Sequence, residues 1–397
     1  MAIEKRIELE EDAISADIPT SDEVTAMEDG GAEVTLTDQT EIDEAEAMGL
    51  LDEQPMMETS HDANLAEVME ESDIQAVSQE LLEGFDRDKQ SREEYDEIAE
   101  DGINLLGLQY DDSAGSFPGS SGVTHPVLAQ AVVKFQAKAY KELFPTEGPV
   151  RTRIMGTQTQ EKLDQSNRVR QFLNWQTQTQ MPEYGPELDK MLFHVALYGT
   201  SFKKTYFNPA LQRPVTEFIK AQDFYVDYYA SDLETAERYT HKYLISKNEI
   251  KKMQLAGVFR DIDVDIDYTI EQTSADELSD ETIGSSKPGE NDDYANILEM
   301  HVNIDLPGFE DPDGIKLPYI VHLTEDGDVL AIRRNYDADD MMRKKKMYFT
   351  HYTMIPGLGF YGYGYIHLIG GLTKTATSSM RQLIDAGTFA NLPGGFK

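Results

Sequence analysis

The sequence contains no cysteine and a single tryptophan among its 397 residues. Without cysteine the chain forms no disulfide bond and no thiolate metal site, which suits a protein assembled in a reducing cytoplasm. No run of about 18 apolar residues occurs, so no membrane-spanning helix is expected. The first residues, Met1 to Arg6, also lack the apolar core of a signal peptide.

Positive charge is scarce, since 35 Lys and Arg face 74 Asp and Glu and the formal net charge is -39. Before Arg87, the two cations Lys5 and Arg6 face 27 acids, a balance of -25. Residues 1–62 therefore predict an acidic, disordered leader, because such a segment cannot bury enough apolar surface to offset its chain entropy. The remaining -14 is spread over about 310 residues, so the body is only moderately acidic. It is still not expected to bind DNA through a general basic face, because phosphate neutralisation requires clustered Lys and Arg.

Residues 63–354 predict one domain of an α+β protein. Apolar residues recur at spacings of three and four over 63–108, 124–145, 157–175 and 186–198, which predicts helices there. Alternation by two then predicts strands, and we expect one small antiparallel sheet from 201–207, 215–220, 224–228 and 239–245. A short helix over 246–257, an acidic edge strand over 261–267 and a loop over 271–293 follow. The last strands are expected at 295–306, 317–324, 328–334 and 347–354.

Residues 355–391 are expected to form a glycine- and tyrosine-rich turn followed by one helix. The helix is predicted from Ile366 to about Asp385, with Gly387 turning the chain out of it. Small side chains alternate with large apolar ones, so neighbouring backbones can approach closely. The helix then either fills a globular core or packs against copies of itself in a ring. The residues expected to pack along it are Leu368, Leu372, Thr373, Ala376, Thr377, Met380, Leu383 and Ile384.

Two sets of cations stand out as candidate contacts to DNA or to a neighbouring subunit. Lys374 and Arg381 lie seven residues apart and share one face of the predicted helix, where Arg381 can also pair with Asp385. The second set could equally be a solvated loop, or contact the acidic strand at 261–267 of another copy. Its members are Arg333, Arg334, Arg343, Lys344, Lys345 and Lys346.

No catalytic, cofactor-binding or metal-binding constellation is recognisable. The loop 357–362 matches the dinucleotide fingerprint, but no second strand with an acidic residue follows it in a βαβ unit. The aspartates at 261–267 alternate with apolar residues, but neither register supplies the glycine and glutamate of an EF-hand loop. We therefore expect no enzyme, no metal and no cofactor. An acidic enzyme that binds a metal ion or a nucleotide stays the alternative.

Four carboxyl-terminal motifs occur in a specific order: Phe360-Tyr361-Gly362-Tyr363-Gly364, His367-Leu368-Ile369-Gly370, Arg381-Gln382-Leu383-Ile384-Asp385-Ala386-Gly387 and Asn391-Leu392-Pro393-Gly394-Gly395-Phe396. Together they resemble the portal proteins of tailed double-stranded DNA bacteriophages, most closely the long portals of short-tailed phages. The resemblance continues more weakly upstream to about Leu81 and does not cover the acidic leader.

The resemblance implies the portal fold, in which residues 63–354 form the wing and residues 355–391 contain the stem helix of a ring subunit. It implies that residues 392–397 begin the clip, whose remainder is absent. In that family the ring is dodecameric, stands at one capsid vertex of the virion and passes DNA without sequence specificity during packaging and ejection. The implied partners are other copies of the chain, the major capsid protein and scaffold, the terminase, the tail adaptor and double-stranded DNA, with no membrane. Another capsid-associated interaction protein stays a further alternative.

Overall fold

A computed structural model describes residues 23–26, 32–35, 60–107, 120–209, 211–264, 294–312 and 314–391. The chain divides into two compact units, Met1–Glu58 and Thr59–Lys397. In the first unit, strands β1 (Glu23–Ala26) and β2 (Ala32–Thr35) pair antiparallel. The predicted disordered leader, the loop 271–293 and the clip segment 392–397 fall mainly or wholly outside the described residues.

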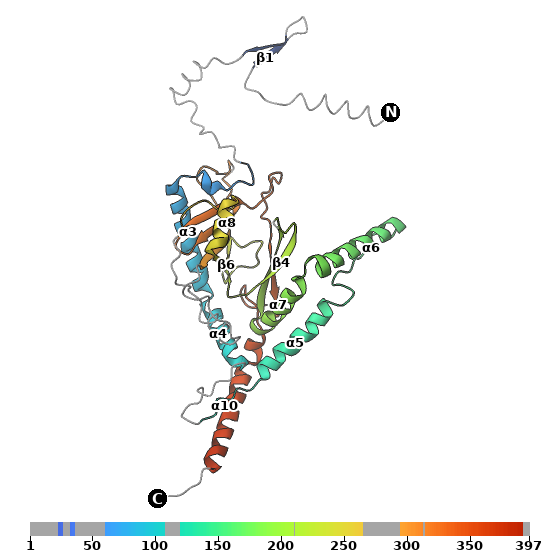
Figure 1. The fold of residues 1–397 in the computed structure, drawn as a ribbon, viewed down its shortest axis with the longest axis vertical. Coiled ribbons are helices and arrows are strands. Elements are labelled where there is room, and N and C mark those ends of the chain that lie inside the picture. The colour runs from blue at the N-terminus through green and yellow to red at the C-terminus, as the bar shows by residue number, and fades with distance from the viewer. Residues whose placement is uncertain are drawn as a thin grey trace. The chain divides into compact units, whose positions relative to one another are not determined.

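The described part of Thr59–Lys397 is a mixed α+β fold with seven α-helices and two antiparallel sheets, which confirms the predicted class (Figure 1). Its helices are η1 (Leu65–Glu67), α3 (Glu71–Ser91), α4 (Glu93–Leu106), α5 (Val127–Leu143), α6 (Gln160–Trp175), the π-helical turn η2 (Gln176–Gln180), α7 (Tyr184–Tyr198), α8 (Lys247–Leu255) and α10 (Tyr365–Asn391). Its strands are β3 (Thr200–Asn208), β4 (Arg213–Ile219), β5 (Phe224–Val226), β6 (Arg238–Ser246), β7 (Tyr294–Ile304), β8 (Leu317–Thr324), β9 (Val329–Arg334) and β10 (Phe349–Thr353).

The strands separate into two sheets where the sequence predicted that the first four would form one. β3 is the centre of a three-stranded sheet in the order β10-β3-β4, and the other five strands follow one another in the order β5-β6-β7-β8-β9. Residues 220–224 turn the chain from β4 into the second sheet. Alternation identifies strands but not their partners, because β10 joins β3 across about 150 residues of sequence.

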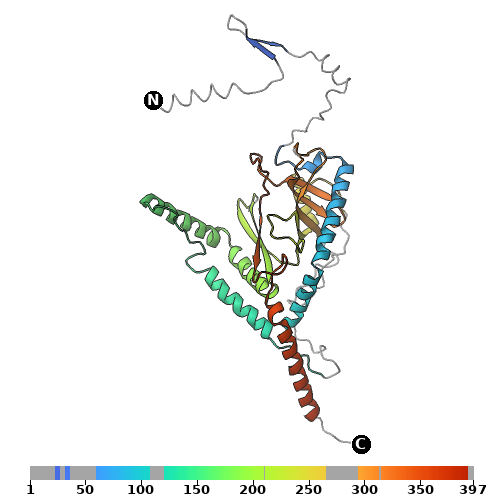
Figure 2. The same cartoon turned by 180° about the vertical axis from the view of Figure 1, so that it is seen from behind.

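The five-stranded sheet is covered on both faces. Leu298 of β7 joins the core beneath α3, whereas the adjacent Ile297 joins the core beneath α8. Successive strand residues point to opposite faces, so one strand serves both cores. A third core lies where α4, α5 and α7 meet β3, β5 and β10, and Phe202, Phe224 and Tyr361 belong to it. Figures 1 and 2 show α10 leaving the body beside α4 and α5.

Several helix boundaries differ from the predicted ones, and α5 and α7 begin at Val127 and Tyr184 instead of 124 and 186. The segment 63–108 breaks at Arg92 into α3 and α4. α6 is capped by Thr159, whose hydroxyl accepts a hydrogen bond from the N–H of Lys162 at 3.4 Å. α10 continues through Gly387 to Asn391, because Gly387 lacks the positive φ of a C-cap and its helix cost of about 1 kcal/mol does not stop the helix. In addition, residues 261–264 are not in a strand, since Ile262 and Val264 pack beside α8 instead.

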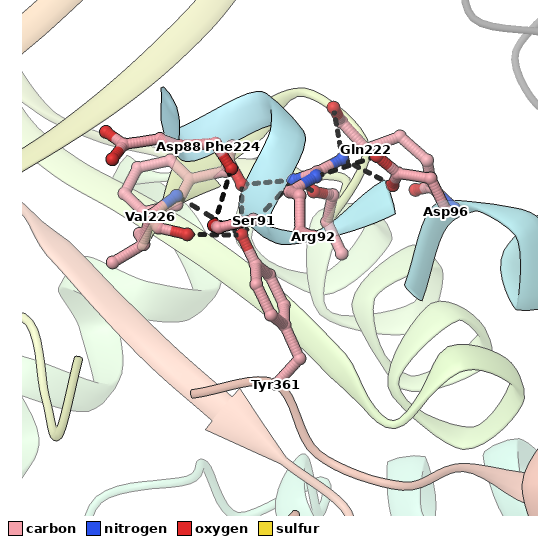
Figure 3. A network of polar contacts seen from close by, with 9 residues as sticks. Asp88, Ser91, Arg92, Asp96, Gln222, Phe224, Val226 and Tyr361 are labelled. Carbon is pink, nitrogen blue, oxygen red and sulfur yellow. Dashed lines mark hydrogen bonds and ion pairs between the residues drawn. The ribbon is translucent and has the colours of Figure 1, made fainter. Parts of the chain in front are cut away.

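One buried cation joins segments that are distant in the sequence. Arg92 lies between α3 and α4 and is fully buried. Its guanidinium donates to the carbonyl oxygens of Ala221, Gln222 and Phe224 at 2.7, 3.0 and 2.7 Å, and forms a bidentate pair with Asp96 at 2.9 and 2.7 Å (Figure 3). The elbow between the two helices is therefore fixed to the turn that leads into β5.

Tyr361, just before α10, completes the same network. Its hydroxyl accepts from Arg92 Nη1 at 3.3 Å and from the N–H of Val226 at 3.2 Å, and its ring stacks on Tyr95 of α4. Burial alone would lower the pKa of Arg92, but Tyr361 and Asp96 hold that pKa well above its usual value, so the guanidinium keeps its charge. The start of α10 is thus fixed to the α3–α4 elbow.

The glycines of the turn before α10 permit a close approach of two backbones. The N–H of Gly362 donates to the hydroxyl of Thr200 at 2.7 Å. A Cβ at Gly364 would collide with the carbonyl oxygen of Leu197, and Gly199, which ends α7, has a φ of +92°. Side chains larger than hydrogen would separate α10 from the end of α7.

The Arg92 network predicts a large loss of stability on substitution. Arg92→Met removes every donor and leaves Asp96 and three carbonyl groups without their partner, which costs about 3 kcal/mol or more. Arg87→Met on the exposed side of α3, where the guanidinium donates to the carbonyl of Glu83, is the matched control and changes stability by about 0.5 kcal/mol or less. Urea denaturation followed by circular dichroism measures both, and equal midpoints for the two variants would refute the role given to Arg92.

Candidate functional site

The candidate functional site is α10, whose inner face packs on its own chain. Ile366, Gly370, Thr373 and Thr377 are buried and recur at spacings of three and four, so they lie on one side of the helix. This side contacts α4, α5 and α7. The hydroxyl of Thr377 also accepts a hydrogen bond from the N–H of His125 at 3.0 Å.

The outer face of α10 carries large apolar side chains that the chain does not cover. Leu368, Leu372 and Leu383 expose 55%, 63% and 76% of their surface. At about 3.6 residues per turn they lie within one narrow sector, roughly opposite Thr373 and Thr377. We call these three residues the leucine face. Leu368 and Leu372 are one turn apart, and Leu383 lies about three turns further along the same side. Exposed apolar residues aligned on one side of a helix mark a surface that another molecule covers.

The leucine face corrects the single stripe that the sequence predicted. A step of four residues advances about 40° around a helix, so the series 368, 372, 376, 380, 384 winds from the outer face to the inner one. Ala376 and Met380 are accordingly half-buried, and Ile384 is 38% exposed. The small residues Thr373 and Thr377 pack against the chain itself.

The loop that precedes α5 lies along α10 and engages its charged residues. Arg381 Nε donates to the carbonyl oxygen of Val123 at 2.8 Å, and Asp385 accepts from the N–H of Ser121 at 2.7 Å. Lys374 lies 3.7 Å from a carboxylate oxygen of Asp101 on α4, and both side chains are exposed. Lys374 and Arg381 therefore have partners within the chain, and their contact with DNA or another copy stays a prediction.

The cations of residues 333–346 also act largely within the chain. Arg333 donates to the carbonyl oxygens of Asp62 and Val258 at 2.8 and 3.0 Å, and Arg334 donates to that of Ser60 at 3.2 Å. Further partners are Asp311 for Arg343 (3.6 Å), the carbonyl oxygen of Ala236 for Lys345 (2.8 Å) and Asp337 for Lys346 (2.6 Å). Burial lowers the pKa of Lys345. Because these cations contact their own chain, residues 333–346 are more than a solvated loop.

Lys344 is more exposed than its neighbours Arg343, Lys345 and Lys346, and its backbone N–H donates to the carboxylate of Asp340 at 3.0 Å. It borders an open hollow of about 550 Å³. The charged lining consists of Lys316, Arg343, Lys344, Lys345 and Glu234. This excess of positive charge would suit an acidic group of another molecule. The hollow is therefore the place where the cations of residues 333–346 could contact another molecule.

A buried ionic cluster connects the two sheets, and no local pattern in the sequence predicted it. Glu299 of β7 pairs with Lys204 of β3, the Nδ1 atom of His241 lies 3.4 Å from the carboxylate, and His301 Nε2 donates to it at 3.1 Å. Burial alone would raise the pKa of Glu299, but Lys204 and the two imidazoles hold that pKa well below its usual value. The carboxylate therefore stays charged, and the cluster orients the sheets.

The loop 357–362, which matches the dinucleotide fingerprint, packs within the core of its own chain. In the loop 357–362, Phe360 and Tyr361 are buried in the chain's own core, and a Cβ at Gly359 would collide with Tyr228. The loop therefore has no room for a pyrophosphate. Within the described ranges no three His, Asp or Glu side chains are arranged to hold a metal ion. The strand predicted at 261–267 lies partly outside these ranges.

No family model matches this sequence, and no curated protein matches it. Among the helices that the structure describes, none has the length and apolar character needed to cross a bilayer.

Two half-buried histidines predict a dependence of stability on pH. Burial lowers the pKa of His322 to about 4 and that of His351 to about 4, below the ordinary value of about 6.5. Between these values the unfolded chain binds protons that the folded chain does not, so stability falls as the pH drops from about 7 towards about 4. Each histidine contributes a slope of at most about 1.4 kcal/mol per pH unit. The pKa of Glu299 is depressed, so its contribution to stability is lost only when the pH falls below the ordinary pKa of a glutamate.

His322→Gln should remove one such contribution. Urea denaturation between about pH 7 and about pH 5 should then give a shallower decline of the unfolding free energy than in the parent protein. The slope of the unfolding free energy against pH is the quantity to compare, because the substitution also changes stability at neutral pH. An unchanged slope would contradict the assignment of His322 as a neutral group in the folded protein.

Proposed function

We propose that this chain is the subunit of a viral portal, a ring at one capsid vertex of a tailed bacteriophage through which double-stranded DNA enters and leaves the virion. The single observation that carries the proposal is the leucine face of α10. It lies on a long helix whose other face is already occupied by the chain. The motif order around this helix, which resembles that of phage portals, supports the same proposal.

The packing of α10 explains why the leucine face suits contact with further copies. Fully burying one leucine contributes about 1.5–3 kcal/mol, and exposing three on one helix forgoes that contribution. Assembly into a ring would recover this free energy of burial, because each subunit presents its outer helix face to a neighbour at the same angle. The small residues Ser379 and Ala386 lie in the same sector as the leucines and leave room for close packing.

The proposed channel function follows from the ring. An acidic body passes DNA without gripping it, because phosphates are repelled by carboxylates and held only by clustered Lys and Arg. In this proposal the ring docks the terminase during packaging and the tail adaptor afterwards, and contacts the major capsid protein and scaffold at its rim. The wing comprises residues 63–354, and α10 is the stem helix beside the channel. The subunit itself performs no catalysis and needs no cofactor.

Leu372→Glu tests the proposal. A carboxylate in the middle of the leucine face should weaken association at least about tenfold, because a lost leucine contact of about 1.5 kcal/mol or more corresponds to that factor. Ser378→Glu is the matched control, since Ser378 is exposed on the same helix about a quarter turn or more away from the leucine face. Sedimentation velocity of the intact protein measures the association.

Both variants should keep the melting temperature of the isolated subunit, because both positions are exposed. We expect the parent protein and Ser378→Glu to form large particles of uniform mass that look annular in electron micrographs, and Leu372→Glu to remain mostly monomeric. A parent protein that stays monomeric at every concentration, or a Leu372→Glu variant that assembles like the parent, would refute the proposal.

A further inference from the structure

α6 is a second helix that the chain leaves uncovered. None of its residues is buried. Val169, Phe172 and Trp175 recur every three residues and lie on one side of the helix, and the two aromatic side chains expose 57% and 48% of their surface. Phe172 and Trp175 contact each other, with ring centroids 5.8 Å apart. Arg168 lies on the same side. We call these four residues the aromatic face.

The aromatic face is held in a defined position. Asn174 exchanges two hydrogen bonds with the backbone of Val150, at 2.8 and 3.2 Å, and Ser166 bonds to Thr152 at 2.8 Å. These contacts fasten α6 to the segment that follows α5. α5 in turn packs on α7 through a core that includes Phe135. The arm formed by residues 127–180 is therefore a fixed projection, and Figures 1 and 2 show α6 at its far end.

The arm carries a positive charge in an otherwise acidic chain. Residues 127–180 contain eight Lys and Arg and four Asp and Glu, a balance of +4, whereas the whole chain carries -39. The five cations at or near α6 are Arg151, Arg153, Lys162, Arg168 and Arg170. A partner that covers the aromatic face must therefore offer negative charge together with some apolar surface.

The chain itself carries such a surface on α4. Glu94, Glu97 and Asp101 are exposed on one side of this helix, and Ile98, which is 39% exposed, lies among them. Over residues 70–107, thirteen acids face three cations. Two of these cations have acidic or carbonyl partners within the chain, since Arg92 pairs with Asp96 and Arg87 donates to the carbonyl of Glu83. Asp96 and Asp101 pair with Arg92 and Lys374, so the exposed Glu94 and Glu97 are the acids that α4 offers to a positively charged partner.

We infer that the aromatic face of α6 docks on the acidic side of α4 of a second copy of this chain. The two surfaces are different patches of one chain, so the contact is heterologous and repeats from copy to copy, closing into a ring if the rotation permits. Trp175 and Phe172 bury against Ile98, and Arg168 meets Glu94 and Glu97. This contact lies outside the leucine face and rests on the proposed function only in that both place copies side by side.

Nucleic acid is the less favoured occupant. Stacked aromatics and arginine also suit single-stranded nucleic acid, but the acids Glu161 and Asp164 interrupt the positive charge of α6. If nucleic acid covered the aromatic face, the acidic side of α4 and its exposed Ile98 would have no role. A second copy accounts for both surfaces.

A charge exchange tests the inference. Arg168→Glu should weaken association about tenfold or more, and Glu94→Arg with Glu97→Arg should weaken it similarly, because each places like charges across the contact. The combined variant should recover most of the loss, which measures the coupling between the two helices. Arg170→Glu is the matched control, since it carries the same reversal on the opposite side of α6 and should leave association unchanged.

The single tryptophan supplies an independent readout. Trp175 is the only indole in the chain, so selective excitation reports this position alone. Its emission should shift to shorter wavelength as the protein associates, because the indole leaves water. Trp175→Ala should weaken association about thirtyfold, as expected when a central aromatic residue is truncated.

The outcomes separate this inference from the proposed function. Assembly that depends on Leu372 but not on Arg168 or Trp175, with unchanged indole emission, would overturn the docking of α6 and leave the ring intact. An emission shift caused by added DNA and abolished by Arg168→Glu, without any effect on assembly, would assign the aromatic face to nucleic acid instead. Recovery in the charge-exchanged variant supports the inference whether or not the leucine face is also needed.

Discussion

The structure depends on keeping one guanidinium charged in the absence of water. Arg92 is fully buried, yet two carboxylate oxygens and three carbonyl oxygens accept its hydrogen bonds. A buried charge is tolerated only when its partners are complete, so the elements that supply those partners cannot move independently. These elements are the elbow between α3 and α4, the turn before β5 and, through Tyr361, the residues that lead into α10. The ion pair of Glu299 with Lys204 applies the same constraint between the two sheets.

Two helices extend from this fixed body with one side uncovered. α10 uses its small residues to approach α4, α5 and α7 and leaves three leucines facing outward. α6 is fastened by polar contacts to the segment after α5 and exposes Phe172 and Trp175. An isolated subunit built in this way leaves apolar surface in water at two separate places. Both features favour a chain that functions as part of an assembly, and the contact that we propose between copies rests on the opposite charges of α6 and α4.

The sequence predicted the class of fold and most elements, because local periodicity and caps determine them. Ser246 caps α8 within the helix predicted over 246–257, and Gly327 takes a positive φ between the strands predicted at 317–324 and 328–334. Partners across long stretches of sequence were not predictable, so β10 was not assigned to β3 and the first four strands were placed in one sheet. On α10 the spacing of three and four located the helix, but it did not show that Leu372 faces outward while Thr373 faces inward. The charge of the arm was visible in the sequence as a local excess of Lys and Arg, and was missed because the cluster near residue 344 is denser.

The most direct test of the central claim is to ask what lies next to the leucine face in the intact protein. Ser379 is exposed in the same sector as Leu372 and Leu383, so a photoreactive amino acid at this position would attach to whatever covers that face. After illumination of the purified protein, denaturing gel electrophoresis should resolve a ladder of bands at whole multiples of the chain mass, each containing only this chain. Bands at the mass of a single chain alone, from protein at the highest concentration attainable, would contradict the account.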